Sequence, residues 1–435
     1  SCTTENRPRE VVLYENYCAK CHVAPDIKDL PKDIWKNNIL PAMAARMGIL
    51  TTENHPYHSL PFPEQMSIIK TGIFPSKPII EADDWELLKN YIIDLAPDSI
   101  VNNNPHIKSS PLSQFKSNPI SLDSAVGSLY TFLKIDTANS TILTGTRKGE
   151  LASFDLKTKE NSLVGYFNRA ITEAKIVGDS TYVTSMGLLV PSEIPYGKII
   201  LKHNNTSASI MDSLHLPVHT LYIDLDKNGT EEIVVSEFGN LQGKLTLLEK
   251  DSYGFYKEKS LLNIPGTIRV IPKDMNADGK DDLVVLAAQG DEAVYILYQK
   301  DNLEFTIEKV LRFSPLYGTS WFEMVDYNGD GYDDQDGDLD FALLATFPDY
   351  ENHPEYNFVY LENLDGSNYT FKQEHLTDTT TARWFLMDSA DIDGDGDEDI
   401  VLSALTYSFT PVPKELEEAW GKSYTDLLIL ENKLH

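Results

Sequence analysis

The residues with the most specific chemistry stand near the start of the 435-residue chain, in the segment Cys18-Ala19-Lys20-Cys21-His22. Two thiols separated by two residues and followed at once by an imidazole form the attachment pattern of a c-type haem. The thiols add to the haem vinyl groups, and the histidine becomes the proximal iron ligand. The sequence therefore predicts one covalent haem held by Cys18, Cys21 and His22.

The sixth iron ligand is less closely defined by the sequence. A methionine thioether raises the iron potential and suits electron transfer. Met43, which follows the turn Leu40-Pro41-Ala42, is the first candidate, ahead of Met47 and Met66. His55 or His58 would instead give a bis-histidine haem. The same two histidines could also complete a zinc site with the cysteines, which is the less favoured interpretation of the motif.

Four acidic loops form the second chemical signal. Each has Asp or Asn at positions 1, 3 and 5, glycine at position 6 and a carboxylate at position 9, so alternate oxygens can wrap a hard cation. Position 12 never carries the bidentate glutamate of an EF-hand, and four in-phase copies favour about four calcium sites over a solvated acidic face. The predicted ligands are Asp224, Asp226, Asn228, Glu232, Asp274, Asn276, Asp278, Asp282, Asp326, Asn328, Asp330, Asp334, Asp391, Asp393, Asp395 and Asp399.

These loops also mark a repeat, because their starts are 50, 52 and 65 residues apart and each precedes an apolar strand. A period of this size with several strands per unit indicates a β-propeller. Two earlier units without acidic loops, at roughly 128–168 and 170–214, bring the count to six. Seven is the alternative if the 350s contain another unit. The last unit is one strand short, and we expect the segment near Ile120 to supply that strand and close the ring.

The third loop carries an acidic insertion that extends to residue 340. This insertion offers a second, overlapping register for the ligands. Asp334 and Asp340 are therefore both candidates to close the third site.

A further pattern lies in the strands that precede the loops. The residues five and three positions ahead of each first ligand share a parity, so they face the same way in successive strands. If these strands lie innermost, a cluster forms near the axis from His219, Arg269, Trp321, Glu323 and Asp388. Such a cluster is either a pocket or a buried ion-pair network between blades, and the network is the preferred interpretation. Further candidates for either are Arg312, His353, Arg383 and Trp384.

The domain organisation follows from these patterns. Residues 1–100 are predicted to be helical, with a helix over 83–95 that has acids in its first turn and ends before Pro97. The polar, Pro- and Ser-rich stretch 101–118 is predicted to be a linker. Residues 119–435 form the propeller. The predicted fold is a small all-α domain followed by an all-β propeller.

The charge balance excludes some functions. There are 67 acids against 37 bases, which gives a formal charge of −30. So acidic a surface repels phosphate backbones and anionic lipid, so a nucleic-acid or polybasic membrane role is excluded. No apolar run approaches the length of a transmembrane helix. Cys2, behind Ser1, matches what a processed lipoprotein signal leaves, so membrane contact is expected only through a lipid on Cys2. The alternative is a free thiol in a frayed terminus.

The chain resembles a bacterial architecture in which a single-haem cytochrome c domain precedes FG-GAP/VCBS-type repeats. The haem-domain resemblance rests on 17–22, Leu40-Pro41-Ala42-Met43, Trp85, Tyr91 and 95–99, and the four loops resemble the calcium-binding repeat of integrin-α-like propellers. This resemblance covers nearly the whole chain and implies Met43 as the sixth ligand. It also implies a secreted or surface-anchored lipoprotein. The insertion at 334–340 and the two motif-free repeats depart from the pattern.

Two classes of function follow. The first is a periplasmic or cell-surface electron-transfer protein whose propeller is a docking or ligand-binding platform for a redox partner. The second is an oxidoreductase whose propeller pocket oxidises a small substrate, such as a sugar, and passes electrons to the haem. A third, weaker alternative is a carbohydrate- or protein-binding module with the haem domain as a sensor. The first is favoured because the sequence shows an electron carrier and no organic-cofactor motif. Haem c maturation places the protein outside the cytoplasm in every case.

Overall fold

The chain divides into two compact units, residues 1–105 and 106–435. None of the helices within the described residues is long and apolar enough to cross a membrane. The computed structural model describes residues 7–18, 26–52, 54–58, 60–99, 109–190, 192–204, 206–289, 291–313, 318–327, 340–346, 348–364, 371–406 and 412–434.

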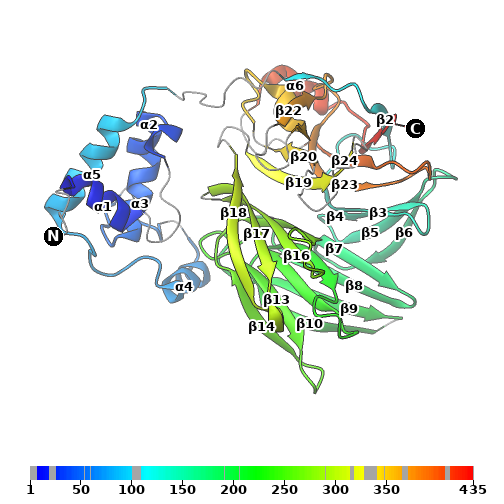
Figure 1. Cartoon of the computed structure of the whole chain (residues 1–435), viewed down its shortest axis with the longest axis horizontal. Coiled ribbons are helices and arrows are strands. Elements are labelled where there is room, and N and C mark those ends of the chain that lie inside the picture. Colours follow the sequence, from blue (N-terminus) through cyan, green and yellow to red (C-terminus); the bar gives the residue numbers. More distant parts are fainter. Residues whose placement is uncertain are drawn as a thin grey trace. The chain divides into compact units, whose positions relative to one another are not determined.

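In the described part of the first unit, every regular element is a helix (Figure 1). The helix predicted over 83–95 is confirmed, because Trp85, Leu88 and Ile92 recur at helical spacing and are buried along its length. The helical elements are α1 (Arg9–Cys18), η1 (Ile27–Asp29), α2 (Lys32–Ile34), η2 (Trp35–Ile39), α3 (Leu40–Arg46), α4 (Phe62–Thr71) and α5 (Ala82–Leu95).

A π-helical turn interrupts the continuous helix made by α2, η2 and α3. The backbone N–H of Leu40 bonds to the carbonyl of Trp35, and Pro41 follows at once with no N–H of its own. Trp35 is fully buried, and its indole N–H donates to the carbonyl of Ile27 at 2.8 Å. This turn fixes where α3 presents its side chains to the core of the unit.

The second unit is a six-bladed β-propeller. Each blade contains four antiparallel strands, to which blade five adds a short parallel strand at its outer edge, and the innermost strands β3, β7, β11, β15, β19 and β23 contact their neighbours all round the ring. From blade one to blade six the strands are β3 (Tyr130–Asp136), β4 (Thr141–Thr146), β5 (Glu150–Asp155), β6 (Asn161–Tyr166); β7 (Ala170–Val177), β8 (Ser180–Gly187), β9 (Gly197–His203), β10 (Thr206–Leu214); β11 (Pro217–Ile223), β12 (Glu232–Glu237), β13 (Lys244–Lys250), β14 (Tyr256–Leu262); β15 (Thr267–Lys273), β16 (Asp282–Gln289), β17 (Asp291–Gln299), β18 (Phe305–Arg312); β19 (Thr319–Val325), β20 (Asp340–Ala345), β21 (Phe358–Asn363), β22 (Phe371–His375); and β23 (Arg383–Ala390), β24 (Asp399–Leu405), β25 (Leu427–Glu431), β2 (Lys116–Ile120).

The ring closes in blade six by pairing the two ends of the propeller sequence. Strand β2 runs antiparallel to β25, with Lys116 opposite Glu431 and Ile120 opposite Leu427. The expected closing strand near Ile120 is therefore confirmed. Six blades are present rather than seven, because the 350s hold only the short helix η4 (Pro354–Asn357) and the start of β21 in blade five. The remaining short helices are η3 (Asp301–Leu303) and α6 (Lys414–Trp420).

The predicted linker at 101–118 is wrong on its C-terminal side. Strand β1 (Ser110–Pro111) pairs with β22, and the closing strand starts at residue 116. Phe115 is buried, with its ring 6.0 Å from that of Tyr327 and 5.9 Å from that of Tyr360. Polar composition suggested a linker, but this one aromatic residue ties the segment to the core. Residues 101–108 lie outside the described part of the chain.

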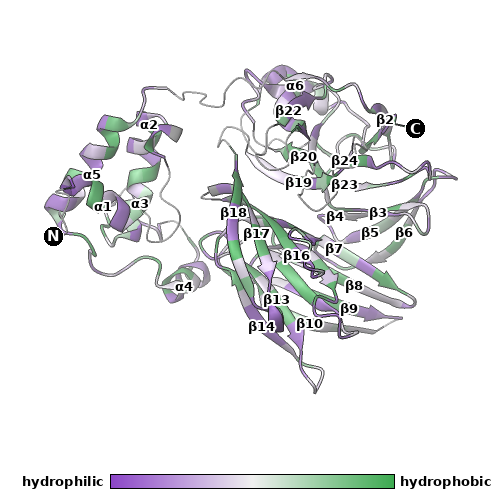
Figure 2. Cartoon of the chain, viewed as in Figure 1, coloured by the Kyte–Doolittle hydropathy of each residue, from purple (hydrophilic) through white to green (hydrophobic). Residues whose placement is uncertain are grey.

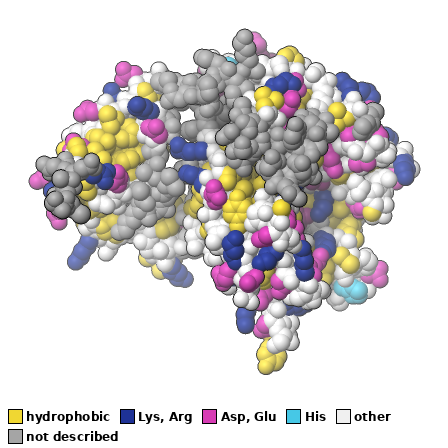
Figure 3. Space-filling view, in the orientation of Figure 1, with side chains coloured by type: hydrophobic (Ala, Val, Ile, Leu, Met, Phe, Trp, Pro, Cys, Tyr) yellow, Lys and Arg dark blue, Asp and Glu magenta, His cyan; other side chains and the backbone are white. Residues whose placement is uncertain are grey.

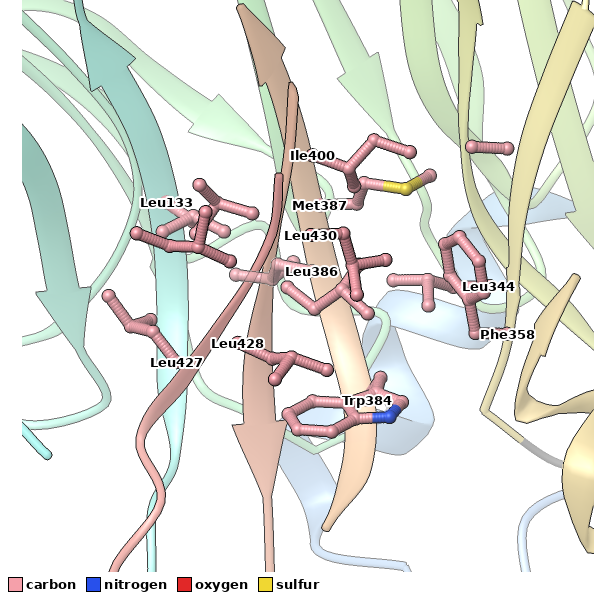
Figure 4. Close-up of a cluster of buried hydrophobic side chains, with 14 of the residues drawn as sticks. Leu133, Leu344, Phe358, Trp384, Leu386, Met387, Ile400, Leu427, Leu428 and Leu430 are labelled. Carbon is pink, nitrogen blue, oxygen red and sulfur yellow. The ribbon is translucent and has the colours of Figure 1, made fainter. Parts of the chain in front are cut away.

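Apolar side chains fill the space between neighbouring blades. In Figure 4, Leu386 and Met387 of β23 meet Leu344 and Phe358 of blade five, while Leu133 of blade one belongs to the same cluster. Figure 2 shows that hydrophobic residues follow strands such as β16 and β17 along their length, as expected for strands buried on both faces.

The first prediction concerns closure of the ring. Phe115→Ala should lower the free energy of unfolding of the propeller by about 3–5 kcal/mol, the usual cost of deleting a buried phenylalanine ring. The control is Phe255→Ala, because the Phe255 side chain is exposed. Urea denaturation followed by circular dichroism measures both. Equal stability of the two variants would contradict the place of residues 110–120 in the propeller.

Candidate functional site

The CxxCH motif begins at the last residue of α1. Cys18 is a free cysteine that lies buried in the apolar core of the first unit, together with Leu13, Trp35 and Trp85. Burial raises the pKa of the Cys18 thiol to about 12, so the sulfur is uncharged at neutral pH. Cys21 and His22 lie outside the described residues.

Two of the three candidate methionines share this core. Met47 is buried in it and Met43 packs against it, both from α3 or its end. Met66 lies on α4 and is not part of this cluster. His55, another candidate, has its ring 5.4 Å from that of Tyr57.

The first, second and fourth acidic loops share one hydrogen-bonding scheme. In the first loop, the carboxylate of Asp224 accepts the N–H of Asn228 at 2.9 Å and the N–H of Gly229 at 2.8 Å. Gly229 has φ +87°, a backbone conformation that favours glycine. The second loop repeats both bonds with Asp274, whereas the fourth keeps the bond from the position-6 glycine, Gly396, to Asp391, which also accepts the N–H of Gly394. The backbone of each loop therefore holds its carboxylates together before any cation binds.

In two loops, three carboxylates converge closely enough to share one ion. One oxygen from each member lies within 4.8 Å of the others in the groups Asp224, Asp226, Glu232 and Asp391, Asp393, Asp395. The second loop has Asn276 at position 3, so an amide oxygen replaces one of its carboxylates. Carboxylate and amide oxygens are the donors that calcium prefers, so these residues fit the ion.

A single acidic residue closes each loop from the first position of the following strand. Glu232, Asp282, Asp340 and Asp399 occupy this position, and each accepts the N–H of the residue after the first ligand, at 2.9–3.2 Å. Asp340 pairs with Val325 across the ladder, just as Asp282 pairs with Lys273. Of the two candidates for the third loop, Asp340 therefore holds the closing position, and Asp334 lies outside the described residues. The insertion lengthens the loop without moving this position.

The third loop is otherwise described only at Asp326 and Tyr327. Its predicted ligands Asn328, Asp330 and Asp334 lie outside the described residues. Burial raises the pKa of Asp340 and of Asp399 to about 6, with further increases from the neighbouring Asp326 and Asp393 respectively. A divalent cation would relieve the repulsion among these carboxylates.

The five residues that the sequence predicts near the propeller axis lie together in the structure. The Arg269 guanidinium donates to the Glu323 carboxylate at 2.6 Å, and its Nη1 lies 2.8 Å from His219 Nε2. It also lies 3.6 Å from the Asp388 carboxylate and 5.1 Å from the centre of the Trp321 ring. All five predicted residues thus meet at the axis. Among the described atoms, Arg269 Nε and His219 Nδ1 are buried without a hydrogen-bond partner.

One member of the axial cluster comes from a motif-free blade, and sequence reasoning missed it. Glu173 of β7 is buried 3.9 Å from His219. Burial raises the pKa of both Glu173 and Asp388, and the positive charge of the exposed Lys134 on β3 opposes that rise. Without an acidic loop, these strands offered no reference for the register. The strand pairing supplies this register. Glu173 lies opposite Thr184 in blade two at the position where His219 lies opposite Ser236 in blade three.

Burial dominates the electrostatics of the cluster. It raises the pKa of Glu173 and of Glu323 to about 7, despite the opposing charge of Arg269. Burial and Arg269 together hold the pKa of His219 well below its usual range, so its imidazole is neutral. Arg269 and Asp388 remain partly exposed, with 16% and 17% of their side-chain surfaces accessible. Water can therefore reach part of these two charged groups.

The other proposed members contact different groups. Arg312 is exposed at the end of β18. His353 stacks on Tyr356, and the Arg383 guanidinium lies 5.7 Å from the ring centre of Trp420. Trp384 lies in the core between blades.

Residues 274–335 and 334–402 each match the FG-GAP-like repeat, and together these matches cover under a third of the chain. They span the second, third and fourth acidic loops, so FG-GAP repeats are present in this propeller. A comparison with curated proteins found no significant match.

Several solved structures are similar at low identity. Regucalcin, a calcium-binding protein from Agrobacterium tumefaciens, is 10% identical with a TM-score of 0.45, over 75% of this chain and 97% of its own. The Cps50 (Swd1) β-propeller domain of Myceliophteria thermophila is 11% identical with a TM-score of 0.34, over 67% and 87%. Because these scores are below 0.5, the propeller architecture rests on the strand pairing described above.

A second prediction tests the acidic loops. Asp224→Asn combined with Asp391→Asn should lower the melting temperature of the propeller by several degrees in saturating calcium, because a ligand of the native state stabilises it by mass action. In EGTA, the variant and the unmodified protein should melt together. Asp155→Asn is the control, since Asp155 also caps a turn, through the N–H groups of Lys157 and Thr158, but has no ligand pattern. A melt unchanged by EGTA would remove the calcium assignment.

A third prediction concerns pH. The pKa of Glu323 is raised from 4.5 to about 7, so between these values the native state holds a proton that the unfolded state has released. Its contribution to stability is full below about pH 4.5 and is lost as the pH rises through 7. The difference in unfolding free energy between the unmodified protein and Glu323→Gln should therefore fall across this range. Urea titrations in calcium from pH 5 to pH 8 measure it, and a constant difference would refute the shift.

Proposed function

We propose that the protein is an extracytoplasmic c-type cytochrome that transfers electrons, with its calcium-stabilised propeller as the docking or ligand-binding platform. The observation that carries the proposal is the placement of Cys18. The first residue of the CxxCH motif ends a helix and lies inside the core that also contains Met43 and Met47.

The donor set fits a covalent haem. Cys18 and Cys21 would form the two thioethers, His22 would be the proximal ligand, and Met43 or Met47 the distal one. A thiol held uncharged in an apolar core suits a neutral thioether better than a zinc thiolate. Met43 has priority because it also matches the resemblance to cytochrome c domains. When bound, haem c supplies a one-electron iron couple, and this chain's residues hold it and exclude water from it.

The propeller's contribution is to present a rigid surface. Bound calcium would neutralise part of the −30 charge and link each loop to its strands. Haem c attachment outside the cytoplasm and an oxidising, calcium-rich compartment are mutually consistent. A redox partner that carries positive charge would be attracted to this acidic protein, and salt should weaken their association.

A fourth prediction tests the haem assignment. Cys18→Ala combined with Cys21→Ala should abolish covalent haem, because no thiol remains for the vinyl groups. Acid–acetone extraction followed by haem staining of a denaturing gel measures this. Retention of covalent haem by the double variant would overturn the proposal.

The distal ligand is tested separately. Met43→Ala should remove the weak long-wavelength ferric band of methionine–iron coordination, whereas Met66→Ala should leave it unchanged.

A second candidate function is oxidation of a small substrate, such as a sugar, at the axial cluster. The partly exposed pair Arg269 and Asp388, with neutral His219 beside them, favours this alternative.

A fifth prediction separates the two functions. If the protein is a dehydrogenase, a sugar or alcohol should reduce the ferric haem anaerobically, and Asp388→Asn should slow that reduction at least tenfold. Reduction by dithionite alone would leave electron transfer as the function.

A further inference from the structure

The first acidic loop contains an exposed asparagine that is directly followed by glycine. Asn228 and Gly229 both lie at the surface, and a Cβ atom built on Gly229 would meet no atom within 4 Å apart from its chain neighbours. Because glycine has no Cβ, its peptide nitrogen is free to approach the side-chain amide of the asparagine before it. The sequence has one other Asn-Gly pair, Asn328-Gly329, which lies outside the described residues.

Hydrogen bonds engage each atom that such an attack would use. The Gly229 N–H, whose nitrogen would attack, donates to Asp224 Oδ2 at 2.8 Å. Asn228 Oδ1, on which negative charge would develop, accepts the N–H of Thr230 at 2.8 Å. Asn228 Nδ2, which would leave as ammonia, donates to Asp226 Oδ2 at 2.9 Å. The loop therefore offers a proton acceptor to the attacking nitrogen and a hydrogen-bond donor to the developing oxyanion.

Position 5 is where the first loop differs from the other three. It carries the amide of Asn228, whereas the others carry the carboxylates of Asp278, Asp330 and Asp395. Loss of the amide would add a carboxylate at this position, and the affinity of an oxygen site for calcium depends on its number of ligand charges. On the face drawn in Figure 3, acidic side chains are interspersed with Lys and Arg, so the added charge would act mainly within its own loop.

From these observations we propose that Asn228 is a self-modification site, at which the calcium-free loop converts the asparagine to aspartate. Gly229 N forms a bond to Asn228 Cγ, its proton passes to the Asp224 carboxylate, and the bond from Cγ to Nδ2 breaks. Ammonia leaves with that proton, and a five-membered imide remains. Water then opens the imide at either carbonyl, which gives aspartate or its β-linked isomer. The sum is amide plus water to carboxylate plus ammonium, with no oxidant or cofactor.

Calcium would oppose this reaction. The proposed ion site uses Asp224 and the amide oxygen of Asn228 as ligands, so a bound ion would occupy the proton acceptor and hold the amide in place. A loop that stays empty would slowly gain a carboxylate and, with it, affinity for the ion. This inference goes beyond the proposed electron transfer. Only its calcium dependence rests on the proposed function, because the bond-forming step needs no metal.

The experiment is incubation of the full-length protein in calcium and in EGTA, followed by peptide mapping with mass spectrometry. Asn139 is the matched control, because it is also exposed in a hairpin turn and its Nδ2 donates to Asp136 Oδ2 at 2.7 Å. Asn139 is followed by Ser140, which has a Cβ, so Asn228 should react at least about tenfold faster in EGTA. Calcium that leaves fewer than about one loop in ten empty should slow Asn228 at least about tenfold.

A second comparison separates the folded loop from its sequence. In the protein, Asp224→Asn should slow the reaction of Asn228 in EGTA at least about tenfold, because the placed proton acceptor is lost. In a synthetic peptide of residues 222–234, which has no fixed turn, the same change should leave the rate unaltered. An Asn228 amide that persists after the peptide has reacted, equal rates at Asn228 and Asn139, or an Asp224→Asn protein that reacts as fast as the unmodified one would each overturn the proposal.

The calcium arm distinguishes this inference from the calcium proposal. Reaction of Asn228 at the same rate in calcium and in EGTA would support the modification and count against an ion in this loop. The product is represented by Asn228→Asp, which should reach half of its calcium-induced rise in melting temperature at a lower calcium concentration than the unmodified protein. A midpoint at higher calcium would overturn the proposed gain in affinity.

Discussion

Ring closure is the constraint on which the axial cluster of the propeller depends. At the outside, β2 pairs with β25 and joins the two ends of the propeller sequence. At the axis, the Asp388 carboxylate of blade six accepts the N–H of Ile135 of blade one at 2.7 Å. Asp388 can face Arg269 of blade four only because the ring is complete. The pairing of β2 with β25 therefore fixes the positions of the blades, and the charged cluster at the axis forms because the blades are held in those positions.

Much of this architecture could be predicted because the acidic loops supply a register. When the loops are aligned, the residues five and three positions ahead of each first ligand are those that face the axis. The sequence therefore predicts His219 and Arg269, but not Glu173. Blades one and two lack the loops, so their contributions could be read only from strand pairing. The prediction of a linker was wrong because it rested on the average composition of residues 101–118. The structure of this segment depends instead on one residue, Phe115, whose ring is buried.

The helical unit shows a different limit of sequence reasoning. The proposed haem chemistry of Cys18, Cys21 and His22 follows from the motif without any fold, because covalent attachment would need only those groups at that spacing. The distal ligand, by contrast, depends on how α3 is turned, and a π-helical turn directly before Pro41 sets that orientation. Periodicity cannot reveal a single inserted residue of this kind. Of the three candidate methionines, Met43 and Met47, on or at the end of α3, lie at the core that contains Cys18.

The axial cluster carries a high desolvation cost for the folded propeller. Three carboxylates, the Arg269 guanidinium and a neutral imidazole occupy a region that apolar side chains could fill at lower desolvation cost. Burial raises the pKa of two of these carboxylates to about 7, so the cluster does not hold its charges at their most stable. A purely structural core would not need Arg269 and Asp388 to reach solvent, yet both do. The hydrogen bond of Arg269 to Glu323 and the contact of Arg269 with Asp388 make the cluster an ion-pair network between blades four, five and six. The solvent access of Arg269 and Asp388 is what distinguishes this network from the hydrophobic core, and any ligand-binding role proposed for the propeller would have to use these two groups.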